Sequence, residues 1–139
     1  MNEKLLFLPI LIQILLTIFL YIYLGVAKGK AVKAGLVNEA RRGLHTDAWP
    51  ENVIKIGNNV SNQFESPTIF FVLIFMAWSI GATGMLVHIL AWSFLATRLV
   101  HCYIHTGSNY VPLRKKVFSV GCLILLALSL VILQVIIAS

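Results

Sequence analysis

The chain has 139 residues and a formal net charge of +6, with 59% hydrophobic residues, 12% charged residues and a mean hydropathy of +0.89. Soluble domains carry about 25% charged residues, so this composition excludes an ordinary soluble domain and indicates an integral membrane protein. The length allows one domain of about four membrane spans and leaves no room for a separate soluble catalytic domain.

The first hydrophobic segment, residues 5–27, contains no charged residue and predicts a membrane helix. At about 1.5 Å per residue it is long enough to cross the hydrocarbon core of a bilayer. A cleaved signal peptide is the alternative, because Gly25 and Ala27 would permit a cleavage site. The apolar core of a signal peptide is only about 7–15 residues long, so we expect a retained span.

The middle of the chain predicts two further spans that are joined by a tight turn. Residues 66–97 contain no Asp, Glu, Lys or Arg, and this run is too long for one span and too short for two. Gly81 and Gly84 supply the turn, and each span must include polar residues beside the run. The predicted spans are residues 5–27, 58–80, 85–106 and 113–138. We expect a single all-α domain, a four-helix up-and-down membrane bundle.

Two stripes of polar residues lie at the ends of the second and third spans. The stripes are Asn58, Ser61, Asn62 and Glu65, and Arg98, His101, Cys102 and His105. Each stripe has i, i+3, i+4, i+7 spacing and therefore lies on one helix face. In antiparallel neighbours the pairs at equal depth would be Asn58 with His105, Ser61 with Cys102, Asn62 with His101, and Glu65 with Arg98. Because a lone charge in lipid is costly, we expect a buried Glu65–Arg98 ion pair.

The sequence leaves two interpretations of these stripes open. Ionisable groups within a membrane commonly form a ligand site or a relay. The same contacts could instead only hold the two helices together, although polar bonds between membrane helices average well under about 1 kcal/mol. Cys102 also has two interpretations, as a ligand or reactive thiol, or as a packed and inert side chain.

Basic residues cluster in the first and third predicted connections. They are Lys28, Lys30, Lys33, Arg41, Arg42 and Lys55 in the first, and Arg114, Lys115 and Lys116 in the third. Short basic loops stay in the cytoplasm, so we expect the polar stripes on the cytoplasmic side and both termini on the other side. The net positive charge is then explained by membrane topology, without nucleic-acid binding. The basic connections would also attract membrane lipids with anionic head groups or an anionic cofactor. The short chain without an organelle signal favours a bacterial inner membrane.

An ordered set of motifs marks the starts of the second and fourth spans and the end of the third. The motifs are Asn62-Gln63-Phe64-Glu65-Ser66-Pro67, Arg98-Leu99-Val100-His101 and Pro112-Leu113-Arg114. Together with the length and the four-span layout, they resemble the membrane-associated proteins in eicosanoid and glutathione metabolism, the MAPEG family. The resemblance covers essentially the whole chain.

This resemblance implies a homotrimer of four-helix protomers, with glutathione bound between neighbouring protomers and lipophilic electrophiles arriving from the bilayer. The residues implied for the glutathione site are Asn62, Glu65, His101 and Arg114. Glu65 would face the amino group of the tripeptide and Arg114 its thiol, while Arg98 would support the Glu65 carboxylate. Asn58 and His105 continue the same stripes as candidate cofactor-binding residues, or they are solvated helix ends.

The chain also differs from typical glutathione-using members of the family. Those members have arginines that hold the carboxylates of glutathione where this chain has Asn58 and Ser61, and a neutral residue cannot replace a bidentate charged contact. His105 stands in place of an expected tyrosine, and Phe118 in place of an expected aromatic hydroxyl. Lysines of the first connection could compensate for the missing arginines.

Three functions therefore remain open. The first is a glutathione-dependent transferase or peroxidase, in which Arg114 and the positive end of the last helix stabilise a thiolate. The second is a non-catalytic scaffold that binds a lipid or a small amphiphile. The third, which ranks last, is a metal site formed by His101 and His105 with Glu65 or Cys102 opposite, close to the disfavouring charge of an arginine.

Overall fold

The computed structural model describes residues 3–138, and this part of the chain contains helices and no strand. The elements are η1 (Glu3–Phe7), α1 (Leu8–Lys33), η2 (Thr46–Ala48), α2 (Glu51–Asn62), α3 (Ser66–Ser79), α4 (Met85–Thr106) and α5 (Val111–Ala138). The 4 stretches that are long and apolar enough to cross a membrane are Glu3–Lys33, Glu51–Ser79, Met85–Thr106 and Val111–Ala138. The prediction of an all-α, four-span membrane protein is confirmed.

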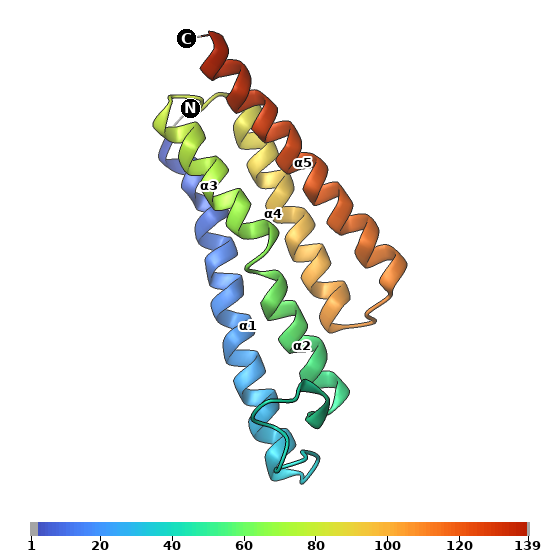
Figure 1. Ribbon diagram of the computed structural model, residues 1–139. Coiled ribbons are helices and arrows are strands. Elements are labelled where there is room, and N and C mark those ends of the chain that lie inside the picture. Colours follow the sequence, from blue (N-terminus) through green and yellow to red (C-terminus); the bar gives the residue numbers. More distant parts are fainter. Residues whose placement is uncertain (1–2, 139) are drawn as a thin grey trace.

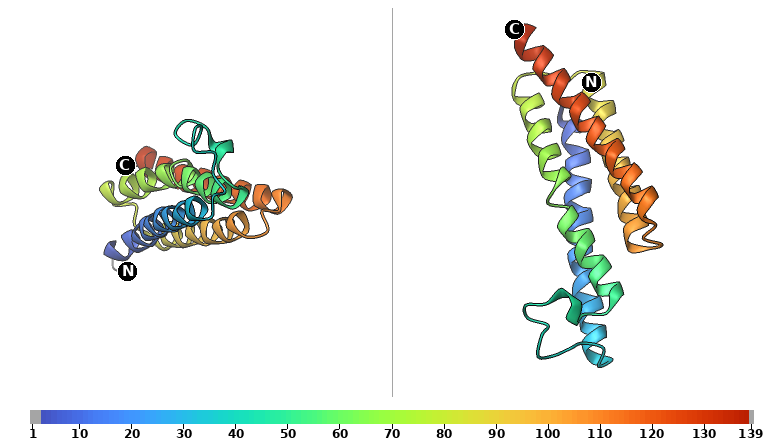
Figure 2. Two further views of the ribbon diagram at one scale, coloured as in Figure 1. Left: turned by 90° about the horizontal axis from the view of Figure 1, so that it is seen from below. Right: turned by 45° about the vertical axis from the view of Figure 1, so that its right-hand side comes forward.

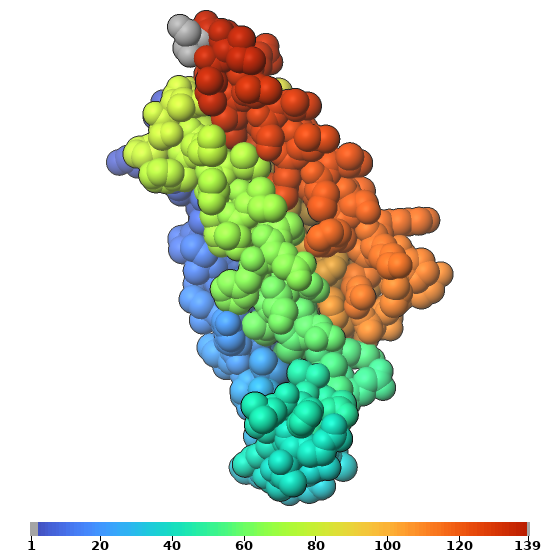
Figure 3. Space-filling view, viewed as in Figure 1, coloured from blue at the N-terminus to red at the C-terminus, as the bar shows by residue number. Residues whose placement is uncertain are grey.

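Successive spans run in opposite directions, and α3 continues α2 after a short break (Figure 1). Helix α5 packs against α4 and α3, while α2 packs against α1 and α4. The start of η1 and the end of α5 lie at one end of the bundle, as two further views show (Figure 2). The connection between α1 and α2 forms a compact cap at the other end and projects beyond the turn between α4 and α5 (Figure 3).

The apolar core lies where α3, α4 and α5 meet. Phe70 of α3 and Phe94 of α4 are fully buried and stack with their ring centroids 4.6 Å apart, and Leu128 of α5 belongs to the same cluster. Gly121 allows α5 to approach α4 closely, because a Cβ at this position would lie 3.1 Å from Oγ1 of Thr97. Large apolar side chains also cover the outside of every span, as expected for a protein whose solvent is lipid.

The second span, predicted over residues 58–80 with the backbone loosened at Pro67, is fully interrupted in the structure. The residues between α2 and α3 are Gln63, Phe64 and Glu65. Glu65 has φ −91° and ψ −102°, which are not helical values. Pro67 explains the break, because proline has no N–H and its ring clashes with the carbonyl of the residue four positions earlier, here Gln63. The break changes the rotation of α3 relative to α2, so a polar stripe cannot run on through it. Helix α2 also begins before residue 58.

The two short turns contain residues that tolerate left-handed backbone. Gly81, with φ +73°, lies in the turn between α3 and α4, where the sequence predicts one. Asn109, with φ 50°, lies in the turn between α4 and α5, and asparagine adopts this conformation more readily than most residues. This second turn brings the start of α5 back beside the polar end of α4.

Candidate functional site

A pocket opens beside the break between α2 and α3, and we call it the break pocket. Its volume is about 330 Å³, and its lining residues are Asn62, Glu65, His101, Arg114, Lys115, Phe118 and Ser119. They come from the break, from the last turns of α4 and from the first turns of α5. The four residues that the family resemblance implies for glutathione therefore lie around one pocket.

Glu65 presents a carboxylate at the surface of this pocket. The residue is exposed and precedes α3, but its side chain makes no capping hydrogen bond. Within residues 3–138 no cation lies at ion-pair distance from the carboxylate and no side-chain hydrogen bond reaches it. The carboxylate thus lies exposed without a close ion pair, and it attracts Arg98 only from beyond ion-pair distance.

The predicted buried ion pair between Glu65 and Arg98 is wrong. Arg98 is 1% exposed, and its Nη2 donates a hydrogen bond to the backbone carbonyl of Asn62 at 3.4 Å. The predicted pairing of residues at equal depth is also shifted, because Cys102 contacts Asn59 and not Ser61. The prediction assumed an uninterrupted helix over both stripe residues Asn62 and Glu65. The helix breaks between them, and Glu65 is exposed at the surface.

Arg98 is thus a buried cation without a carboxylate at ion-pair distance in the described part of the chain. Its Nε also has no hydrogen-bond partner among these residues. The desolvation cost of this charge is offset only in part, by the hydrogen bond to Asn62 and by longer-range attraction to the Glu65 carboxylate. Arg98 does not line the break pocket itself, but its hydrogen bond places it next to Asn62, which does.

Arg114 is held in a fixed position by the turn that precedes α5. Its Nη1 donates to Oδ1 of Asn109 at 2.6 Å and lies 3.3 Å from Nε2 of His105. Arginine has donors only, so Nε2 of His105 accepts this bond and the proton of a neutral ring would sit on Nδ1. His105 does not line the break pocket and instead supports Arg114 from behind. Sequence reasoning missed Asn109, for which a lone asparagine in a short turn is the only signal.

His101 lines the pocket between these two arginines. Its Nδ1 is buried and has no hydrogen-bond partner within residues 3–138. The ring faces Phe118 with centroids 6.0 Å apart and His105 with centroids 5.7 Å apart. A buried polar atom without a partner is costly, so a ligand or a water at this position would be stabilised.

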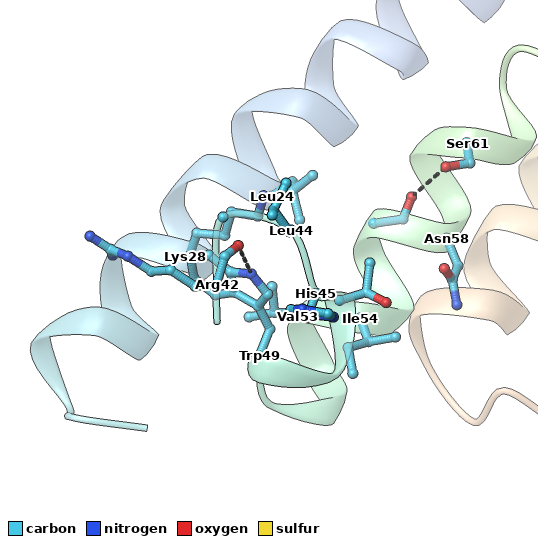
Figure 4. Close-up of a pocket in the computed structure, with 13 residues that line it drawn as sticks. Leu24, Lys28, Arg42, Leu44, His45, Trp49, Val53, Ile54, Asn58 and Ser61 are labelled. Atoms are coloured by element: carbon cyan, nitrogen blue, oxygen red, sulfur yellow. Dashed lines mark hydrogen bonds between the residues drawn. The ribbon is translucent and has the colours of Figure 1, made fainter. Parts of the chain in front are cut away.

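Asn58 and Ser61 line a different cavity, which we call the loop pocket. Its volume is about 330 Å³, and it lies between the end of α1, the connection to α2 and α2 itself (Figure 4). The structure therefore separates the predicted cofactor residue Asn58 from the residues of the break pocket. Ser61 directs its hydroxyl to the carbonyl of Gly57 at 3.3 Å, a bond within its own helix.

A chain of buried amides, which the sequence analysis did not identify, connects α1, α2 and α4. Nε2 of Gln13 donates to Oε1 of Gln63 at 2.7 Å, and Nε2 of Gln63 donates to Oδ1 of Asn59 at 3.1 Å. Nδ2 of Asn59 donates to Sγ of Cys102 at 3.1 Å. Cys102 is therefore a buried acceptor in this chain. A glutamine within the first hydrophobic segment was the available signal.

We expect Gln63→Leu to lower the melting temperature, because it leaves Gln13 without its acceptor and Asn59 without its donor. A buried polar group without a partner costs about 1–3 kcal/mol. Gln134→Leu in α5 is the matched control, since Gln134 is exposed. Unfolding of the purified proteins in detergent, followed by circular dichroism, measures the difference. Equal melting of wild type and Gln63→Leu would contradict this role.

The metal-site alternative lacks a suitable cluster in the structure. Among the described residues no group of three or more His, Cys, Asp or Glu side chains could hold a metal ion. His101 and His105 lie beside Arg98 and Arg114, whose positive charges oppose a bound cation.

The four-span bundle agrees with the comparison to protein families. The MAPEG family model matches residues 6–134, nearly the whole chain. No curated protein and no solved structure gives a significant match. On the strength of the family match, the chain belongs to the MAPEG family.

Proposed function

We propose that this protein is a glutathione-dependent transferase or peroxidase that acts on lipophilic electrophiles. The observation that carries the proposal is the break pocket, which gathers Asn62, Glu65, His101 and Arg114 around one opening. Members of the MAPEG family generally use glutathione as a substrate or cofactor. The pocket combines a free carboxylate with several cationic groups, which fits a ligand that carries an amine, carboxylates and a thiol.

The charged residues that line the pocket can be matched to the charged groups of glutathione. Glu65 would hold the amino group, because its carboxylate is exposed and forms no ion pair within 4.0 Å among residues 3–138. Lys115 lines the pocket and, with the buried charge of Arg98 behind it, would attract a carboxylate. Lys115 thus offers a cation that the positions of Asn58 and Ser61 do not provide. The ammonium of lysine is a point charge, so we expect weaker binding than an arginine pair gives.

The reaction would take place beside Arg114 at the start of α5. Bound glutathione would supply the thiol, whose sulfur bonds to an electrophilic carbon while the thiol proton is lost and the leaving group departs with its electron pair. Arg114 would stabilise the negative sulfur, and the positive end of α5 would add to the effect. Asn109 and His105 hold Arg114 in place. The peroxidase alternative consumes two thiols and a peroxide and yields one disulfide, an alcohol and water.

The surroundings of the pocket suit a substrate that comes from the membrane. Phe118 forms an apolar wall of the pocket, and α5 also exposes large apolar side chains such as Leu123 and Leu126 toward the surroundings of the bundle. We propose a homotrimer in which a neighbouring protomer closes the open side of the pocket. The basic connections support a cytoplasmic position of the pocket and of this end of the bundle in a bacterial inner membrane, with the termini opposite.

A second candidate is a non-catalytic scaffold that binds a lipid or small amphiphile. The absence of cations at Asn58 and Ser61 favours it, because the carboxylates of glutathione would lack their usual partners. In that case Arg98 and Lys115 would bind another anionic head group in the break pocket.

Thioether formation from glutathione and a chloronitrobenzene tests the proposal in purified, detergent-solubilised protein. We expect a rate well above that of buffer and a loss of this rate in Asn62→Ala. Asn52→Ala is the matched control, since Asn52 lies on the same helix, is exposed and does not line the break pocket. A wild-type rate equal to that of buffer for both this electrophile and a lipid hydroperoxide would exclude the enzyme and leave the scaffold.

A further inference from the structure

The loop pocket is a second cavity with both apolar and polar walls. Leu24, Leu44 and Val53 contribute apolar surface, and Lys28 and His45 contribute polar groups. In Figure 4, Lys28 lies on the α1 side of the pocket near Leu24 and Leu44, whereas His45 lies beside Val53 and Ile54 on the α2 side. Such a combination suits an amphiphile with a charged head.

The charge balance around the loop pocket is positive. The three carboxylates of this connection are paired, Glu39 with Arg42 at 2.8 Å, Asp47 with Arg41 at 2.9 Å and Glu51 with Lys55 at 3.1 Å. Lys28 has no carboxylate at ion-pair distance in the described part of the chain, and its Nζ lies 4.9 Å from the ring centroid of Trp49. The unneutralised charge that faces this cavity therefore comes from Lys28.

The depth of the loop pocket matches the head-group layer of a membrane. It lies at the end of the bundle that carries the turn between α4 and α5, where α1 and α2 project beyond the shorter spans (Figure 1). Leu44 at the rim is 93% exposed, and Tyr21 and Tyr23 of the neighbouring α1 turns are also exposed. Tyrosines gather at the membrane interface, and Leu44 offers apolar surface there that an acyl chain could cover.

We propose that the loop pocket binds the phosphate head group of an anionic phospholipid. Lys28 neutralises the phosphate, His45 and Thr46 offer hydrogen bonds, and Leu44 contacts the acyl chains. This site is separate from the break pocket, and it does not depend on glutathione chemistry. It would anchor the connection between α1 and α2 to the membrane surface.

Native mass spectrometry of the protein with phosphatidylglycerol or phosphatidylcholine in mixed micelles tests this proposal. We expect retained phosphatidylglycerol and little phosphatidylcholine, with a roughly fivefold loss of affinity in Lys28→Gln, the effect of one basic residue near a membrane surface. Lys33→Gln is the matched control, because Lys33 is exposed on the same helix end and does not line the pocket. Leu44→Ser, at an exposed position, should also weaken lipid retention, and it provides the test if Lys28→Gln does not fold.

Several outcomes would overturn the lipid site. Equal retention of the two lipids, or equal losses in Lys28→Gln and Lys33→Gln, would show unspecific attraction to a basic surface. Displacement of the lipid by millimolar inorganic phosphate would show a site for free anions, and displacement by glutathione would show that the pocket serves the tripeptide. If phosphatidylglycerol is retained only when Lys28 and Leu44 are present, and the protein shows no reaction with glutathione, the lipid site is supported and the proposed glutathione function is not.

Discussion

Replacing Arg114 by alanine is expected to lower the rate of thioether formation by about 100-fold or more while glutathione still binds. The loss of one preorganised donor at a developing negative charge typically has an effect of this size. Arg114 lines the break pocket, and its Nη1 is fixed by Asn109 at 2.6 Å and by His105 at 3.3 Å. The measurement is a comparison of kcat with KM for glutathione in wild type and variant.

Two further variants locate this effect. Lys116→Ala is the matched control, because Lys116 is an exposed cation near Arg114 that does not line the pocket, and its rate should equal wild type. Asn109→Ala should lose less than Arg114→Ala, since it only frees the guanidinium. An Arg114→Ala rate within about twofold of wild type would remove this residue from the reaction.

Replacing Arg98 by methionine is expected to preserve or raise the melting temperature and to remove glutathione binding. A buried charge without a carboxylate partner costs desolvation energy, so an apolar side chain of similar length relieves the fold. The same change removes the positive charge that lies behind Asn62 in the break pocket. Circular dichroism and calorimetry measure the two effects on the same preparation.

This variant separates a ligand site from contacts that only hold helices together. If Arg98 joins α4 to α2 and nothing more, Arg98→Met should melt several degrees lower and binding should fall only with folding. Glu65→Gln is the companion variant, and we expect it to melt close to wild type, because the exposed carboxylate forms no ion pair or side-chain hydrogen bond within residues 3–138 and attracts Arg98 only at longer range. A lower melting temperature for Glu65→Gln would indicate a contact that the single chain does not contain.

The fold class could be predicted from sequence because hydropathy alone determines it. Lipid requires long apolar helices, and the charge-free run from residue 66 to residue 97 can only be two spans with a turn, which lies at Gly81 with φ +73°. For the second span the sequence predicts a kink at Pro67, whereas the structure has a full break between Asn62 and Ser66. Pro67 signals a distortion, but a proline in a membrane helix can kink it or end it, and packing with neighbouring helices decides.

Four of the residues that line the break pocket could be predicted from the sequence, but the contacts around them could not. The motifs named Asn62, Glu65, His101 and Arg114, and these residues line one pocket. The contacts differ because helical spacing cannot distinguish two adjacent asparagines. Asn58 extends the predicted stripe, yet Asn59 is the residue that is 0% exposed and contacts Cys102. The contribution of Lys115 also needs coordinates, because it depends on the direction in which α5 leaves its turn.

The proposed function requires that glutathione binds in the break pocket through Glu65. Isothermal titration of purified protein with millimolar glutathione tests it most directly, with Glu65→Gln and with glutathione blocked at its amino group. We predict measurable heat for wild type and a loss of affinity of about tenfold or more in Glu65→Gln. The amino-blocked ligand should bind wild type with the same loss, and combining the blocked ligand with Glu65→Gln should cause no further loss. No heat with wild type, or equal affinities of wild type and Glu65→Gln, would contradict the claim.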